Sequence, residues 1–570
     1  MTSLWAPHAE SVVIEFAEQP EAPLVRGDDG WWRSRVSPAG RYRFVVDGFA
    51  MADPRSPWQP EGVDGWSQVV DHGDFQWHDR TWVGRPLAEA LIYELHIGTF
   101  SDAGTFDAAI EHLDHLVDLG VNTVEVMPVA EFSGAYGWGY DGVLLYAPHH
   151  AYGGPGGFKR FVEACHSRRL SVVLDVVYNH FGPHGNHLAR CGPYFSDEYR
   201  TQWGAAVNLD GPRSDVVRQF FCENALMWIH DYHVDGLRVD AVHAFADRSA
   251  RSFLEQLTDA VHEAAHQVGR PIWMIAESDL NDPRVVRSSE DHGLGFDASW
   301  SDDFHHALHA VVTGERTGYY ADFGTLDQLA VALRQSYVYD GRYSEYRRRA
   351  HGRSPAGIAP DRFLAYAQTH DQVGNRALGE RLSALVSPRL LEISAAIVLL
   401  SPFVPMLFHG EEWGASSPFL YFTDHADPAL GAAVQEGRRN EFASFGWDPA
   451  RIHDPQDVAT FVQSKLDWGE TSTSPHADLL SWHRRLIALR STCSVPEGLV
   501  ARDVLVDEAA RCLVVRSSQL TWIANFASDA QRVAVPDAVG DLVLSNDAAI
   551  SVEPDQICMP PQSLAVFRSS

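Results

Sequence analysis

The 570-residue sequence predicts an α/β fold: a closed (β/α)8 TIM barrel flanked by an N-terminal β-sandwich and a C-terminal antiparallel β domain. Two patterns carry this prediction. From about residue 88, short aliphatic or β-branched runs alternate with stretches of helical periodicity, which is typical of a parallel sheet covered by helices. On either side of that region, short strands follow one another between turns rich in Gly, Pro and Asp, which indicates all-β modules.

The first module is expected to span residues 1–87, where short strands are predicted at 12–14, 31–32 and 42–48. The barrel is expected to follow at 88–495. Its eight candidate strands are 91–96, 123–127, 171–177, 236–240, 272–277, 296–300, 363–368 and 404–408. Eight strands that alternate with helical patterns favour closure into a barrel over an open sheet.

Two further parts complete the predicted organisation. Residues 301–360 lie between the sixth and seventh strands and are too long for a plain connection, so we expect them to add helices beside the active face. Residues 496–570 return to alternating strands, at 512–515, 521–523, 542–544 and 564–567. They predict the C-terminal β domain.

Charge and composition exclude several classes of partner. The 45 basic and 76 acidic side chains give a net charge of −31, which repels nucleic acid and anionic membrane surfaces. No apolar run reaches the roughly 18 residues of a membrane span, and the N-terminus lacks the pattern of a secretory signal. The six cysteines include no C-x-x-C pair, so reduced thiols in a cytoplasmic protein are expected.

Three carboxylates lie at or just beyond the ends of predicted barrel strands, where barrels of this kind carry their chemistry: Asp240, Glu277 and Asp371. Gathered carboxylates suit either a divalent metal or glycoside hydrolysis, which needs one ionised and one protonated acid. Arg238 favours hydrolysis, because it faces the same side of the strand as Asp240 and keeps that group ionised. The apolar residues before Glu277 favour a raised pKa there.

Four segments taken together resemble the α-amylase family, glycoside hydrolase family 13. They are D-V-V-Y-N-H at 175–180, G-L-R-V-D-A-V-H-A at 236–244, I-A-E-S-D at 275–279 and T-H-D-Q-V-G-N at 369–375. Any one of them could merely tie a loop to a strand end. All four, in order and on the predicted strands, argue against that interpretation.

The resemblance implies a role for each matching residue. Asp240 matches the nucleophile, Glu277 the general acid/base and Asp371 the third carboxylate, while Arg238 matches the partner of the nucleophile. The remaining matches are sugar-binding residues: His180, His370, Tyr140 and Asp141 for the attacked sugar, His243 for the leaving-group side. Trp203 and residues 301–360 are candidates for the wall of the leaving-group pocket. Asp175 is expected to be structural.

Segments 52–56, 59–60, 203–211, 275–284 and 369–376 resemble one subgroup of the family. That subgroup cuts the α-1,4 bond next to a terminal trehalosyl unit, with retention of configuration, and releases trehalose. The implied partner is an α-glucan oligosaccharide that ends in trehalose, and no cofactor is implied. We predict no metal, because the loop at 181–210 lacks a carboxylate cage.

Two other functions stay open. One is a branching or debranching enzyme of the same family, which would share the catalytic carboxylates. The other is a non-catalytic α-glucan-binding scaffold, against which the intact carboxylates speak. The sequence sets neither the oligomeric state nor the chain length of the preferred glucan.

Overall fold

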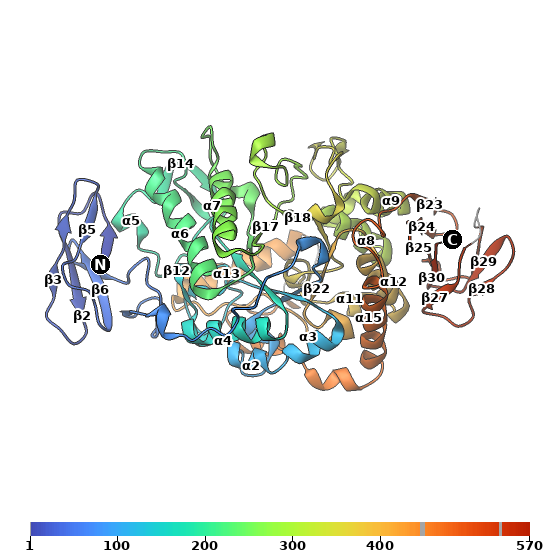
Figure 1. Cartoon of the computed structure of the whole chain (residues 1–570), viewed down its shortest axis with the longest axis horizontal. Coiled ribbons are helices and arrows are strands. Elements are labelled where there is room, and N and C mark those ends of the chain that lie inside the picture. The colour runs from blue at the N-terminus through green and yellow to red at the C-terminus, as the bar shows by residue number, and fades with distance from the viewer. Residues whose placement is uncertain (1, 445–450, 535–538, 570) are drawn as a thin grey trace.

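The computed structural model describes residues 2–444, 451–534 and 539–569. Its three parts follow one another along the longest axis (Figure 1). The N-terminal sheets lie at one end, the barrel and its helices occupy the centre, and the C-terminal sheets lie at the other end. The predicted order of architectures is therefore confirmed. The domain boundaries at residues 87 and 495 stay predictions.

Eight of the described strands close into a parallel barrel. Around the barrel they run in sequence order, and β22 pairs with β9 to complete the circle. They are β9 (Ile92–Leu95), β10 (Thr123–Val126), β13 (Ser171–Val176), β16 (Gly236–Val239), β17 (Trp273–Ala276), β18 (Ala298–Trp300), β21 (Phe363–Ala365) and β22 (Val404–Phe408). All eight candidate strands are thus present, most of them shorter than predicted.

Side chains alternate between the two faces of each barrel strand, as the pleat requires. On β17, Trp273 and Ile275 join an apolar cluster made by strands from all around the barrel, so they point into its lumen. Met274 and Ala276 instead pack with the helices outside. This period of two carries Glu277, the next residue, back to the inner side at the carboxyl end of the strand.

Helices cover the outside of the barrel. They include α3 (Leu113–Leu119), α4 (Gly154–Ser167), α6 (Ser214–Tyr232), α7 (Phe253–Val268) and α12 (Pro388–Leu399). In α7, the Ser252 side chain accepts a hydrogen bond from the Glu255 N–H, and Gly269 ends the helix at φ 73°. Between β17 and β18 the described chain forms no α-helix, only the short turn η5 (Ser289–Asp291).

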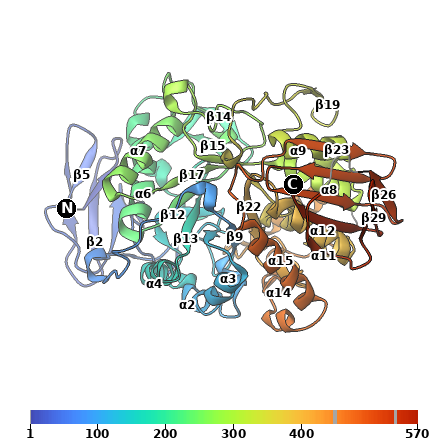
Figure 2. The same cartoon turned by 45° about the vertical axis from the view of Figure 1, so that its right-hand side comes forward.

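Residues 301–360 form helices, the first of which begins at Asp302, beside the carboxyl end of β18. Helix α8 (Asp302–Thr313) packs against α12, and α9 (Leu326–Gln335) packs against the C-terminal strands β23 (Asp503–Asp507) and β24 (Cys512–Arg516) (Figure 2). Helix α9 also packs against α8, and its apolar residues, among them Leu329 and Leu333, are buried. The helices therefore join the barrel to the C-terminal domain, and the segment reaches the active face with only a few side chains.

The terminal modules are antiparallel, as predicted. At the N-terminus, β1 (Ser3–Trp5), β5 (Trp31–Arg33) and β4 (Val25–Arg26) form one sheet, and β3 (Ala22–Pro23), β2 (Val12–Phe16), β6 (Arg41–Val46), β7 (Phe49–Met51) and β8 (Ser67–Gln68) form the other. At the C-terminus, β23, β24, β25 (Leu520–Asn525), β30 (Ser563–Arg568) and β27 (Leu542–Ser545) form one sheet; β26 (Gln531–Ala534), β29 (Gln556–Met559) and β28 (Ser551–Val552) form the other.

Within the described ranges, no helix has both the length and the apolar character needed to span a bilayer. The six cysteines are free thiols, four of them buried.

Candidate active site

A single guanidinium organises the carboxylates at the carboxyl end of the barrel. Arg238, on β16, points into the lumen, where its Nη1 lies 2.7 and 2.9 Å from the two Asp175 oxygens and 2.9 Å from Asp240 Oδ1. Its Nη2 lies 3.7 Å from Glu277 Oε2. The face of the guanidinium lies over the Trp300 ring, 4.3 Å from the ring centre. Arg238 therefore neutralises charge at the floor of the site.

Asp240 follows β16 directly and is held from two sides. Besides Arg238, the Asn179 amide donates to Asp240 Oδ2 at 2.8 Å. The next residue, Ala241, has φ 43°, a left-handed conformation that costs a non-glycine residue about 1 kcal/mol or more. This turn points the Ala241 N–H at Glu277 Oε2, at 2.6 Å. The strained turn thus ties the loop after Asp240 to Glu277.

Glu277 follows β17 and has the environment of an acid that keeps its proton. Burial raises its pKa well above the ordinary value; Arg238 acts against this rise and the charge of Asp240 adds to it. Asp240, by contrast, accepts hydrogen bonds at both oxygens, which stabilises its negative charge. The raised pKa of Glu277 agrees with the apolar residues that precede it in the sequence.

Asp371 and His370 begin the short helix α10 (His370–Gly374), which Thr369 caps. The Asp371 side chain is about half exposed, at 47%, and its Oδ1 accepts from the Asn375 amide at 3.0 Å and lies 3.9 Å from His370 Nε2. His370 is buried on the inner side. Of the three carboxylates, Asp371 is thus the most accessible.

One cavity of about 630 Å³ brings the predicted residues together. It is lined by nine of them: Tyr140, Asp141, His180, Trp203, Asp240, His243, Glu277, His370 and Asp371. Arg238 lies beneath the cavity, almost fully buried. Asp175 binds Arg238 and accepts from the Tyr140 hydroxyl at 2.6 Å, so it supports the site from below, as expected.

Aromatic rings form the walls. Trp203, 41% exposed, stacks on His180 with ring centres 4.7 Å apart and planes 10° from parallel. Tyr140 lies almost parallel to His370, at 5.1 Å. Flat apolar surfaces beside charged groups suit a sugar, which has apolar faces and polar edges.

Several cavity residues were missed by the sequence analysis. Asp302 follows β18 and accepts from the Tyr366 hydroxyl at 2.6 Å, and burial raises its pKa to about 7. Asp279 forms an ion pair with Arg347 at 3.0 Å. Both follow barrel strands, so the rule that located Asp240 could have found them. Tyr421 and Thr423 also line the cavity, but they lie 13 or more residues beyond β22 and no pattern marks them.

Among the described residues, one group offers three ligand atoms within 4.8 Å of one another: Glu131, His149 and His150. It lies outside the cavity. Both imidazole Nδ1 atoms contact Glu131 Oε1, at 3.1 and 2.8 Å, so hydrogen bonding to one carboxylate accounts for the cluster.

Comparisons with known proteins agree with this geometry. Residues 95–203 match the family model "Alpha amylase, catalytic domain". The chain is 52% identical over 517 residues to a malto-oligosyltrehalose trehalohydrolase of Arthrobacter ramosus, covering 89% of both chains. It is 46% identical over 578 residues to the Mycobacterium tuberculosis protein of the same name, covering 100% of this chain and 99% of that one.

A solved structure is also similar over the whole chain. It is a Salmonella typhimurium protein named as an alpha amylase, 38% identical, with a TM-score of 0.91 and coverage of 100% of this chain and 97% of that one. From these matches and the barrel that carries the site, the chain belongs to the malto-oligosyltrehalose trehalohydrolase group of the α-amylase family.

Proposed function

We propose that the protein is a retaining glycoside hydrolase that cuts the α-1,4 bond next to the terminal trehalosyl unit of maltooligosyltrehalose and releases trehalose. The observation that carries this proposal is the pairing of Asp240 and Glu277 around Arg238, inside a cavity walled by aromatic rings. The names of the relatives supply the substrate.

In the first step, Asp240 attacks the anomeric carbon while Glu277 gives its proton to the bridging oxygen. The bond from carbon to the leaving oxygen breaks, trehalose departs with that proton, and a covalent glycosyl-enzyme remains. The hydrogen bonds from Arg238 and Asn179 hold Asp240 in place for the attack.

In the second step, ionised Glu277 takes a proton from water, and the water oxygen attacks the same carbon. The bond to Asp240 breaks, and the glucan leaves with its configuration retained. Asp371, the most accessible of the three carboxylates, is placed to bind sugar hydroxyls and to favour a distorted ring.

We assign the leaving-group side to His243, Trp203, Asp279 and Asp302, which line the cavity together with Glu277. Trehalose is uncharged and carries many hydroxyl groups, so carboxylate acceptors and an aromatic face suit it. Arg347, from the segment at 301–360, acts through its ion pair with Asp279.

One incubation separates this function from its alternatives. The enzyme is given maltooligosyltrehalose, plain maltooligosaccharide and amylose in parallel, and the products are separated. Trehalose from the first substrate alone is the expected result. Branched products from amylose, or cleavage of branch points, would instead select a branching or debranching enzyme. Binding without turnover of any substrate would select a non-catalytic scaffold.

A cytoplasmic location and a place in trehalose synthesis from glucan follow from the proposed reaction and the six free thiols. Both stay predictions.

A further inference from the structure

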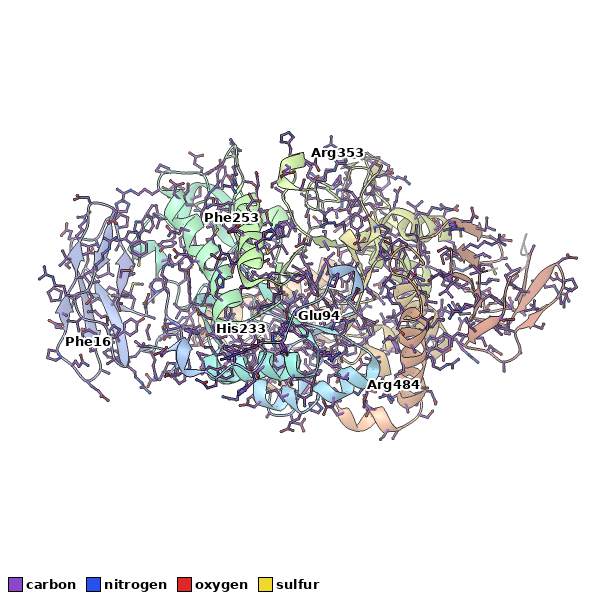
Figure 3. The ribbon with its side chains drawn as sticks, in the orientation of Figure 1. Phe16, Glu94, His233, Phe253, Arg353 and Arg484 are labelled. Carbon is purple, nitrogen blue, oxygen red and sulfur yellow. The ribbon has the colours of Figure 1, made fainter. Side chains whose placement is uncertain are left out.

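Glu94 lies near the middle of the molecule (Figure 3), and its carboxylate contacts His370 twice. It is on β9 and 1% exposed, and β22 separates β9 from β21, the strand that leads to His370. Glu94 Oε1 contacts His370 Nδ1, and Glu94 Oε2 accepts from the His370 backbone N–H at 3.0 Å. The carboxylate therefore fixes both the ring and the backbone of a cavity-lining histidine.

The other ring nitrogen of His370 lies 2.8 Å from the Tyr140 hydroxyl oxygen. That hydroxyl has one hydrogen, which it donates to Asp175 Oδ2 at 2.6 Å. Burial raises the pKa of Tyr140 well above its ordinary value, so the hydroxyl keeps this hydrogen. Toward His370, Tyr140 is then an acceptor, and His370 Nε2 must carry a hydrogen.

The Nδ1 contact needs a hydrogen as well. The contact joins His370 Nδ1 to a carboxylate oxygen of Glu94. In ordinary surroundings imidazole is a stronger base than a carboxylate, by about 2 pKa units. The hydrogen therefore belongs to Nδ1. With hydrogens on both nitrogens, the ring is a cation.

We propose that Glu94 is a positioning residue that holds His370 as an imidazolium and so sets the direction of the hydrogen bonds that run through Tyr140 and Asp175 to Arg238 and Asp240. The proposal rests on the proposed function, because it assigns Glu94 a role in that reaction. Glu94 itself contacts neither the cavity nor the reacting atoms.

The other groups that face His370 do not replace Glu94. Burial acts to lower the pKa of His370, but the Glu94 carboxylate outweighs it, and the pKa lies above the ordinary value. Asp371 adds to the rise and Arg238 opposes it. The neighbouring His96 and His409 are buried, and burial lowers the pKa of each, so they remain neutral. Glu94 is thus the principal counter-ion.

A neutral His370 would reverse the direction of these hydrogen bonds. Its Nε2 would become an acceptor, Tyr140 would turn its hydrogen toward the ring, and Asp175 would lose a donor. Asp175 shares Arg238 with Asp240, so the change would reach the nucleophile through the guanidinium. The site would also lose the positive charge of His370, so that Arg238 alone would balance the charge of the carboxylates.

The test measures the charge of His370 directly. Protein with isotope-labelled histidine is titrated by NMR, and the His370 signal is the one that disappears in His370→Asn. In the wild type, we expect the imidazolium shift to persist above pH 6.5, the ordinary midpoint of a histidine. In Glu94→Gln, we expect the midpoint to fall by about one pH unit or more, and kcat/KM to fall about 10- to 100-fold, as for lost partners of other functional histidines.

Two further variants serve as comparisons. Glu94→Asp keeps the charge and should keep the His370 midpoint above that of Glu94→Gln. Glu125 is the matched control, because it is the register partner of Glu94 on β10, equally buried, and neither of its oxygens has a hydrogen-bond partner among the described residues. Burial raises its pKa well above the ordinary value, so Glu125→Gln removes no charge and should leave the midpoint unchanged.

A neutral His370 at pH 7 in the wild type would overturn the proposal, even if no variant folded. So would an unchanged midpoint in folded Glu94→Gln. Neither result needs turnover, whereas the proposed function fails only if the wild type releases no trehalose.

Discussion

The two ends of the barrel lumen are built from the same strands but have opposite chemistry. Near the amino ends, Ile92, Val173, Trp273 and Met406 form an apolar plug, each 3% exposed or less. Two to four residues further toward the carboxyl ends of the same strands, Glu94, Asp175 and Glu277 face inward. About 7 to 13 Å along a strand thus separates the hydrophobic core from the charged site.

The difference indicates what each end contributes. The plug gains free energy by removing apolar area from water, as a core does. At the carboxyl end, buried carboxylates cost free energy, and Arg238 together with the hydrogen bonds around it offsets only part of this cost. We therefore expect changes at the carboxyl end to remove activity and changes at the plug to remove stability.

The largest expected effect is that of Asp240→Asn. An amide cannot form the glycosyl-enzyme, so kcat should fall by about 10⁴-fold or more, as for other lost nucleophiles. The melting temperature should fall little, because Asn fills the same space. Trehalose release from maltooligosyltrehalose and a thermal melt measure the two quantities. Activity within tenfold of the wild type would contradict the nucleophile assignment.

The second largest effect on activity is expected for Glu277→Gln. Loss of a general acid costs about 10²- to 10⁴-fold, and a substrate with a good leaving group needs little protonation. The variant should therefore recover part of its first-step rate on an α-glycosyl fluoride. In the wild type, the raised pKa of Glu277 predicts that kcat/KM stays high at neutral pH and falls as pH rises through that value. Equal losses on both substrates would argue against the acid role.

At the opposite end, Met406→Ala should lower the free energy of unfolding by about 2–5 kcal/mol, since it opens a cavity in the apolar plug. kcat/KM at a temperature where the variant is folded should match the wild type. Denaturant unfolding and initial rates provide the measurements. A large loss of activity in the folded variant would show that the two ends are coupled.

The smallest effect is expected at Asp302, which lies in the cavity but has a core-like environment. Burial raises its folded pKa to about 7, above the unfolded value near 3.8. Between about pH 4 and 7 the folded state therefore holds a proton that the unfolded state has released, and stability falls as pH rises. The Asp302→Asn variant has no carboxyl group to titrate there, so it does not lose this stability as pH rises. Its melting temperature should therefore exceed that of the wild type at pH 8 but not at pH 4. Equal differences at both pH values would contradict the raised pKa.

Strand ends were the most informative part of the sequence. Asp240, Glu277 and Asp371 could be located because a short aliphatic run followed by a polar residue marks where a barrel strand meets its active face. Helices within 301–360 were also expected, but not the surfaces against which they pack. Nothing in an amphipathic pattern says which apolar surface it will cover, and α9 covers the C-terminal sheet.

The amino-acid sequence by itself determined the barrel, the flanking β modules and the carboxylates, because periodicity and local order fix which residues form strands and which side of a strand each one faces. Only the tertiary structure decided that Glu94 meets His370, 276 positions away, and that Arg238 reaches three carboxylates. Such contacts depend on how the barrel closes. Closure follows from the packing of all eight strands together, and no local pattern specifies it.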